Sequence, residues 1–158
     1  MINYYVYDSP IGKIGIGEEG GKITDVNFER SACKPHEYVT AETPMIKKAH
    51  AQLEEYFAGK RKSFDLPLEP GGTDFQRRCW NALIDIPYGE TRTYADIARA
   101  AGSPQGFRAA GMANNRNHIA IMIPCHRVIG SDGSLIGFGG GLDVKKYLLE
   151  LERRHASD

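Results

Sequence analysis

Alternating apolar and polar positions near the start of the chain predict a meander of three short strands. The segment 3–7 is aromatic and β-branched, and the segments 13–17 and 23–28 alternate apolar with polar residues or glycine. Glycine-containing turns separate the three segments, and the polar segment 30–42 that follows is expected to be a loop. This pattern favours a small antiparallel sheet at the beginning of the chain.

A helical period follows the predicted sheet. Thr43 is a suitable N-cap, Pro44 suits the first helical position, and Gly59 can end the helix. Apolar residues recur between them at helical spacing, and these are expected to lie in the core: Ile46, Ala49, Leu53, Tyr56 and Phe57.

The segment 66–72 is rich in proline and glycine and is predicted to link two domains. The N-terminal domain then spans 1–70 and the C-terminal domain spans 71–158. A chain of 158 residues is long enough for two small domains of this kind.

Helical periods dominate the second domain, where helices are expected over 73–84, 93–102, 105–115 and 143–153. The second of these starts with capping-box spacing, from Thr93 to Asp96, and stops at Gly102. Two short helices joined by a turn with glycine are typical of a helix-turn-helix. The fold class is therefore α/β (α+β) in the N-terminal lobe, followed by a mostly helical C-terminal lobe.

The third predicted helix of this lobe has unusually small side chains: Gly106, Ala109, Ala110, Gly111 and Ala113. Glycine lowers helix stability, so its repeated use needs a reason. Two explanations stay open on the sequence alone: tight packing of this helix on its neighbours, or the close approach of a DNA backbone with Arg108 projecting towards it.

Composition is that of a soluble globular protein, with 41% hydrophobic and 25% charged residues. No apolar run is long enough to cross a membrane, and no signal peptide is evident. Three scattered cysteines do not form a disulfide framework, so a reducing, cytoplasmic location is expected. The net charge is zero, but residues 74–127 hold seven arginines against four acidic residues, which is a weak indication of nucleic-acid contact.

The candidate chemistry lies in the row from Ile123 to Val128, which contains Pro124, Cys125 and His126. Cysteine is a good nucleophile at neutral pH, and a neighbouring base increases its thiolate fraction. Because Pro124 favours an extended backbone and successive side chains then point to opposite faces, a water bridge between Cys125 and His126 is expected. The alternative is that Cys125 is a small buried hydrophobic residue.

Cys33 and His36 have a spacing that a metal site can use, but no second pair of ligands is nearby. No metal and no cofactor are therefore expected.

The row from Pro124 to Val128, with Asn114–Asn117 before it and Gly139–Leu142 after it, resembles the active-site signature of the O6-alkylguanine-DNA alkyltransferases. The resemblance extends from about Phe75 to Glu152. It implies a DNA repair protein that transfers an alkyl group from O6 of guanine, and less readily from O4 of thymine, to Cys125. The resulting thioether is permanent, so each molecule would act once, as a single-turnover methyltransferase.

The resemblance also implies the roles of the catalytic residues. His126 would contact the cysteine through a water, and Glu152 would orient His126. Tyr94 would donate a proton towards the departing guanine, where negative charge develops, and would crowd the phosphate of the flipped nucleotide. Asn117 would brace the turn before Cys125.

The family's partner is double-stranded DNA, bound by a monomer through the minor groove, with the damaged base flipped out and Arg108 filling the space it leaves. The DNA-binding residues implied are Arg108, Tyr94, Gln105, Ala109, Gly111, Ala113 and Arg116. The substrate pocket would be lined by Pro124, Phe138, Gly139 and Gly140. The sequence departs from the family's usual residues at Phe138, Gly139, His118 and the pair Gly106-Phe107.

Three other functions compete with this interpretation. A lesion-binding protein without catalysis would lack the nucleophile that Cys125 supplies. A transcription regulator would need more side chains for reading base edges than this helix offers. A Cys-His hydrolase would need a base from a distant segment and an oxyanion hole, and neither is evident.

Overall fold

The computed structural model, which describes residues 1–135 and 137–158, begins with the predicted meander. β1 (Ile2–Tyr7), β2 (Ile14–Glu19) and β3 (Lys22–Phe28) pair antiparallel in chain order. A fourth strand, β4 (Tyr38–Thr40), lies where a loop was predicted and pairs parallel with β1. The sheet order is therefore β3-β2-β1-β4, and the sheet is mixed. β4 is exposed throughout, so no pattern of buried side chains marks it in the sequence.

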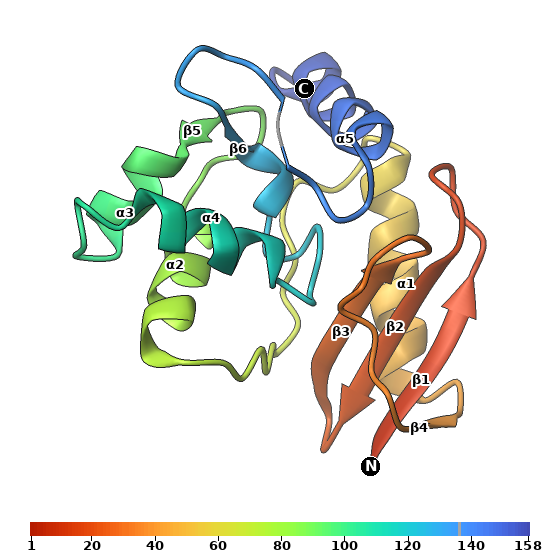
Figure 1. The fold of residues 1–158 in the computed structure, drawn as a ribbon. Helices are drawn as coiled ribbons and strands as arrows, with labels where there is room; N and C mark the ends of the chain where they lie inside the picture. Colours follow the sequence, from red (N-terminus) through yellow and green to blue (C-terminus); the bar gives the residue numbers. More distant parts are fainter. Residues whose placement is uncertain (136) are drawn as a thin grey trace.

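α1 (Pro44–Phe57) packs across one face of this sheet (Figure 1). The Thr43 hydroxyl accepts a hydrogen bond from the Ile46 amide at 3.3 Å, and Pro44 occupies the first turn, as predicted. The predicted apolar side chains are buried, except that Phe57 is half-buried. The apolar period of the helix and the alternation of the strands therefore meet in one core.

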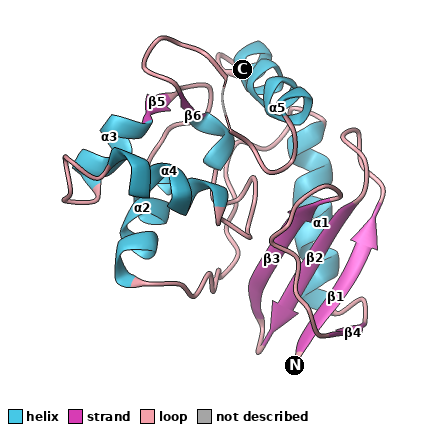
Figure 2. Cartoon of the chain, viewed as in Figure 1, coloured by secondary structure: helices cyan, strands magenta, loops and turns pink. Residues whose placement is uncertain are grey.

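The C-terminal lobe contains the four predicted helices (Figure 2): α2 (Asp74–Ile84), α3 (Tyr94–Ala100), α4 (Phe107–Asn115) and α5 (Leu142–His155). Capping boxes at Thr73 and Thr93 start α2 and α3. α3 and α4 pack together across the turn at Gly102, whose φ is +80°, as in a helix-turn-helix.

α4 starts two residues later than predicted. The Ser103 carbonyl accepts a hydrogen bond from the Gly106 amide at 2.8 Å, which closes a turn ahead of the helix. Gly106 is the N-cap and has no side chain to cap with.

The backbone at the candidate nucleophile is also different from the prediction. The residues Cys125–Arg127 form one turn of 3-10 helix and not an extended segment. A short strand follows, β6 (Val128–Ile129), which pairs parallel with β5 (Arg92–Thr93). The argument that Cys125 and His126 point to opposite faces of a strand is therefore wrong.

Backbone hydrogen bonds join the two lobes along β3. The Val26 amide donates to the His118 carbonyl at 2.8 Å, and the Ala120 amide donates to the Val26 carbonyl at 2.9 Å. Further along the same strand, the Ile23 amide donates to the Pro67 carbonyl of the interdomain segment at 2.9 Å. The chain that leads to Cys125 is thus attached to the sheet of the N-terminal lobe.

Within the described residues, we find no helix with the length and apolar character required to cross a lipid bilayer.

Candidate functional site

A braced turn carries the chain into Cys125. The Asn117 side chain accepts from the Ile119 amide at 3.0 Å and donates to the Ile123 carbonyl at 2.8 Å. Between these contacts Ile121 has a φ of +70°, a conformation that β-branched residues adopt at a cost in energy. The buried Asn117 side chain therefore stabilises a turn whose backbone is strained.

Cys125 is buried at the end of this turn, and its main-chain carbonyl accepts from the side-chain amide of Asn114 at 3.3 Å. Burial raises the pKa of the Cys125 thiol to about 11, against the opposing effects of Asn117 and of the charge on Lys145. At neutral pH the free protein therefore holds a thiol, and its use as a nucleophile requires a base.

His126 offers such a base. Its Nε2 lies 2.6 Å from Glu152 Oε2, and both side chains are buried. Burial lowers the pKa of His126 by more than Glu152 raises it, so the ring is neutral at pH 7. Because an ionised carboxylate can only accept, the proton of the neutral ring lies on Nε2, and Nδ1 carries a lone pair. Among the described residues, buried Nδ1 has no hydrogen-bond partner.

Arg127 holds the same carboxylate from the other side. Its Nε donates to Glu152 Oε1 at 2.7 Å, its Nη2 donates to Oε2 at 3.0 Å, and its Nη1 donates to the Ile86 carbonyl at 2.7 Å. Burial raises the pKa of Glu152, but His126 and Arg127 lower it by more, so the carboxyl is charged at neutral pH. The sequence alone gives no signal for this role of Arg127, because Glu152 lies 25 residues further along the chain.

Tyr94 is placed near Cys125 from the first turn of α3. Burial and then the charge of a Cys125 thiolate raise the pKa of the Tyr94 hydroxyl, so this group stays protonated and can donate. The Tyr94 ring also faces Gly111 of α4, where an added Cβ would lie 3.7 Å from the ring. Gly111 therefore lies against Tyr94, at a distance where a methyl group would make an ordinary van der Waals contact.

Cys125 opens onto a small pocket formed by both lobes. Of the residues expected in the substrate pocket, Phe138, Gly139 and Gly140 line this pocket, while Pro124 is buried beside Cys125 without lining it. The N-terminal lobe adds residues that the sequence did not indicate, including Phe28, whose ring centre lies 5.5 Å from that of Phe138. The volume is about 20 Å³, roughly enough for one water molecule and far too little for a nucleobase.

The small residues of α4 serve two purposes. Ala110 and Ala113 are buried, and the Ala113 carbonyl accepts from the Trp80 indole at 2.9 Å, so the prediction that Ala113 contacts DNA is wrong. Helix packing explains these two positions. Seven side chains on α4 or at its two ends are exposed: Gln105, Phe107, Arg108, Ala109, Met112, Asn115 and Arg116.

No cluster of three or more His, Cys, Asp or Glu side chains suited to a metal ion occurs in the described segments. Cys33 instead donates from its thiol to the Asn115 carbonyl at 3.5 Å.

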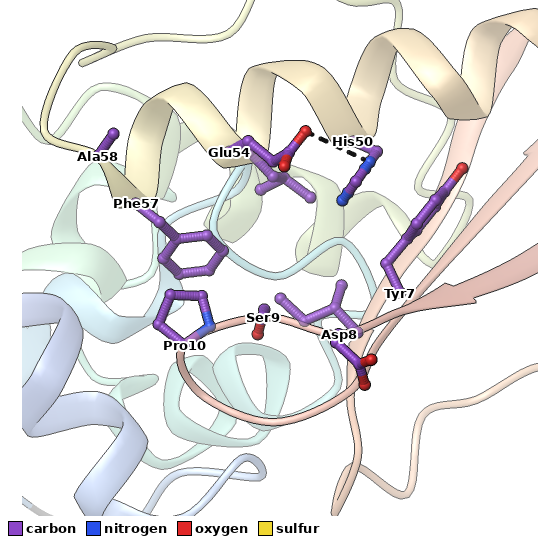
Figure 3. A pocket seen from close by; sticks show the side chains of 10 residues that line it. Tyr7, Asp8, Ser9, Pro10, His50, Glu54, Phe57 and Ala58 are labelled. Carbon is purple, nitrogen blue, oxygen red and sulfur yellow. Dashed lines mark ion pairs between the residues drawn. The ribbon is translucent and has the colours of Figure 1, made fainter.

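A second cavity, of about 320 Å³, lies in the N-terminal lobe between α1 and the β1–β2 turn (Figure 3). Tyr7 stacks on His50 along one wall, with ring centres 3.7 Å apart, and Pro10 and Phe57 form another. None of the predicted site residues lines it. This cavity is therefore separate from the pocket that Cys125 lines.

Comparison with known proteins gives matches over nearly the whole chain. The family model described as 6-O-methylguanine DNA methyltransferase, DNA binding domain, matches residues 74–154, and the one described as the ribonuclease-like domain of the same proteins matches 2–70. A methylated-DNA–protein-cysteine methyltransferase of Methanosarcina acetivorans is 51% identical over 94% of this chain and 97% of its own. The constitutive enzyme of that name from Bacillus subtilis is 45% identical, with 96% of each chain covered.

Solved structures agree with these matches. The crystal structure of Mycobacterium tuberculosis OGT in complex with DNA is similar at a TM-score of 0.90 and 44% identity, over 97% of this chain and 94% of that one.

Proposed function

Because this chain belongs to the 6-O-methylguanine DNA methyltransferase family, we propose that Cys125 is the residue that takes the alkyl group from O6-alkylguanine. The protein is a methylated-DNA–protein-cysteine methyltransferase that acts in DNA repair, and DNA is its partner. The observation that supports the assignment to Cys125 is that it is buried and is followed in the chain by His126, a buried neutral imidazole whose Nδ1 has no hydrogen-bond partner in the described part of the chain.

The proposed step is a displacement at the saturated carbon of the alkyl group. The thiol proton passes to His126 Nδ1, through a bridging water, and the Cys125 sulfur forms a bond to the carbon as the carbon–O6 bond breaks. The electron pair of that bond moves to the guanine, where a proton from the Tyr94 hydroxyl neutralises it. The thioether that results has no labile bond, so each molecule acts once.

The base must enter a pocket that is closed in this structure. Since its volume of about 20 Å³ does not admit a guanine, we infer that Phe28 of the N-terminal lobe and Phe138 of the C-terminal lobe separate as the base enters. A base that is stacked in a duplex cannot reach a buried sulfur, so the nucleotide is flipped out of the helix. A damaged base pair lowers the energy required for this.

The exposed face of α4 is the proposed DNA surface. Arg108 and Met112 lie four residues apart on this face, and Arg116 follows at its C-terminal end. We propose that this face enters the minor groove, that Arg108 fills the space of the flipped base, and that a monomer suffices. Phe107 and Met112 leave 50% and 60% of their surface exposed and add apolar contact area that the sequence analysis did not include.

A lesion-binding protein without transfer remains the second candidate, and only its shared fold favours it. Cys125 with its base argues against it, because binding alone requires no nucleophile.

Intact-protein mass measured after mixing with a duplex that carries one O6-methylguanine tests the function. We expect a gain of one methyl group, never more than one per chain, on the peptide that contains Cys125. An undamaged duplex serves as the control and should give no gain. Tight binding of the damaged duplex without a mass change would instead support the lesion-binding alternative.

Replacement of Arg108 by alanine tests the proposed DNA surface. We expect Arg108→Ala to slow transfer from O6-methylguanine in duplex DNA by about 10–100-fold, because base flipping costs a few kcal/mol that the arginine helps to supply. Transfer from free O6-benzylguanine, which needs no flipping, should stay within about twofold of the parent rate. The intact-protein mass of samples quenched at successive times gives the rate of transfer from each substrate.

The matched control is Arg61→Ala, which removes an arginine of the N-terminal lobe that pairs with Glu55. It should slow neither reaction. Equal slowing of the two substrates by Arg108→Ala would contradict the proposed role.

A further inference from the structure

A tyrosine of the N-terminal lobe reaches the base of the active site. Tyr56 lies near the end of α1 and is fully buried, and its hydroxyl donates to Glu152 Oε2 at 2.6 Å. Burial and the charge of Glu152 raise the pKa of Tyr56 well above its ordinary value, so the hydroxyl always has a proton to donate. Nothing in the sequence distinguishes Tyr56 from the other core residues of its helix.

Three donors share the oxygen to which Tyr56 donates. Glu152 Oε2 accepts from Tyr56 at 2.6 Å, from His126 Nε2 at 2.6 Å and from Arg127 Nη2 at 3.0 Å. Glu152 Oε1 accepts from Arg127 Nε at 2.7 Å and from the Gly89 backbone amide at 3.4 Å. Donors on one oxygen compete for its negative charge, so the Tyr56 hydroxyl limits how strongly Glu152 can attract a proton on His126.

We propose that Tyr56 is a positioning residue for alkyl transfer, which acts through Glu152 to set the orientation of His126 and its affinity for a proton. The N-terminal lobe then takes part in the activation of Cys125 as well as in the fold. This inference depends on the proposed roles of Cys125 and His126.

The charged groups around His126 decide in which direction its pKa moves when the Tyr56 hydroxyl is removed. Glu152 and Lys145 face it from α5, and Arg127 lies beside it; of these, only Glu152 favours the protonated ring. Without the Tyr56 hydroxyl, more of the negative charge on Glu152 is available to the imidazole. The pKa of His126 should then rise, and less of the neutral, basic form is present at a given pH.

The experiment compares Tyr56→Phe with Tyr88→Phe in the full-length chain. Each change removes one phenolic hydroxyl and keeps the ring, and the two rings are neighbours, with centres 6.3 Å apart. The Tyr88 hydroxyl is buried without a hydrogen-bond partner among the described residues, so Tyr88→Phe removes no hydrogen bond from Glu152.

For Tyr56→Phe we expect the first-order rate of transfer from saturating O6-benzylguanine to fall about tenfold at pH 7, as for the loss of one hydrogen bond to a charged group. The acid limb of the pH–rate profile should move to higher pH, while the half-saturating substrate concentration stays the same. Tyr88→Phe should change neither. A purely structural role would lower the fraction of active protein, seen as incomplete alkylation, without moving the profile.

A second measurement does not depend on transfer. The pKa of His126, followed by NMR of the imidazole in each folded variant, should rise in Tyr56→Phe and not in Tyr88→Phe. An unchanged His126 pKa together with a transfer rate within twofold of the parent overturns the proposal. If the parent protein transfers no alkyl group, the proposed function fails, and the NMR titration still decides whether Tyr56 acts on His126.

Discussion

Replacement of Cys125 by serine is expected to abolish alkyl transfer and to leave lesion binding intact. A serine hydroxyl ionises far less readily than a thiol and is a poorer nucleophile towards a saturated carbon, so the rate should fall by more than about a thousandfold. The change from sulfur to oxygen is small, and the main-chain contact of Cys125 with Asn114 does not use the side chain. Mass analysis should detect no added methyl group. The dissociation constant for an O6-methylguanine duplex, measured by fluorescence anisotropy, should stay within about twofold.

Cys33→Ser is the matched control, because Cys33 is a free cysteine at only partial exposure, outside the network of His126 and Glu152. It should gain one methyl group as the parent does. Transfer that persists in Cys125→Ser, or that disappears in Cys33→Ser, would show that Cys125 is not the acceptor.

Replacement of Glu152 by glutamine is expected to produce the largest loss of stability. The change removes the negative charge that compensates buried Arg127, and it places an amide donor among the donors from Tyr56, His126 and Arg127. Breaking a buried ion pair by removing one partner typically costs about 3–5 kcal/mol. The free energy of unfolding at pH 7, from urea titrations of both proteins, measures the loss.

The pH dependence of this loss has a definite direction. The pKa of Glu152 lies well below its ordinary value of 4.5 in the folded protein, so its contribution is complete above about that pH. The contribution is lost as the pH falls towards the folded-state pKa, and the difference in unfolding free energy between the parent and Glu152→Gln should shrink there.

The control variant Glu90→Gln breaks an exposed pair with Arg92 and should cost less than about 1 kcal/mol. A similar small loss in Glu152→Gln would contradict a structural role for the buried pair.

The local signals of the sequence predicted most elements of the fold. The caps at Thr43, Thr73 and Thr93 each accept from the amide three residues further on, so their hydrogen bonds are present wherever the helix forms. Strand alternation and helical spacing likewise identified the residues that are buried between α1 and the sheet. The failures at β4 and at the start of α4 occurred where no side chain carries the signal: β4 depends on backbone pairing with β1, and α4 has glycine at its cap.

The features of the candidate site also divide into those that local sequence signals predicted and those that they did not. Because Cys125 and His126 are adjacent, the sequence alone indicated a nucleophile with a neighbouring base. The resemblance to alkyltransferases added Tyr94, Asn117 and Glu152. The 3-10 turn at Cys125 could not be predicted, because it depends on the braced turn at Asn117.

What the sequence by itself determined is the first three strands, the existence of the α-helices and the reactive row, since these arise from interactions within a few residues along the chain. Only the tertiary structure decided which α4 residues face solvent, with Ala113 in the core and Arg108 exposed. It also decided that Tyr56, 96 residues before Glu152 in the chain, donates to the carboxylate that holds His126. The physical reason is that a buried charge takes its donors from whichever segments the packing of the two lobes brings to it, and sequence separation carries no record of that choice.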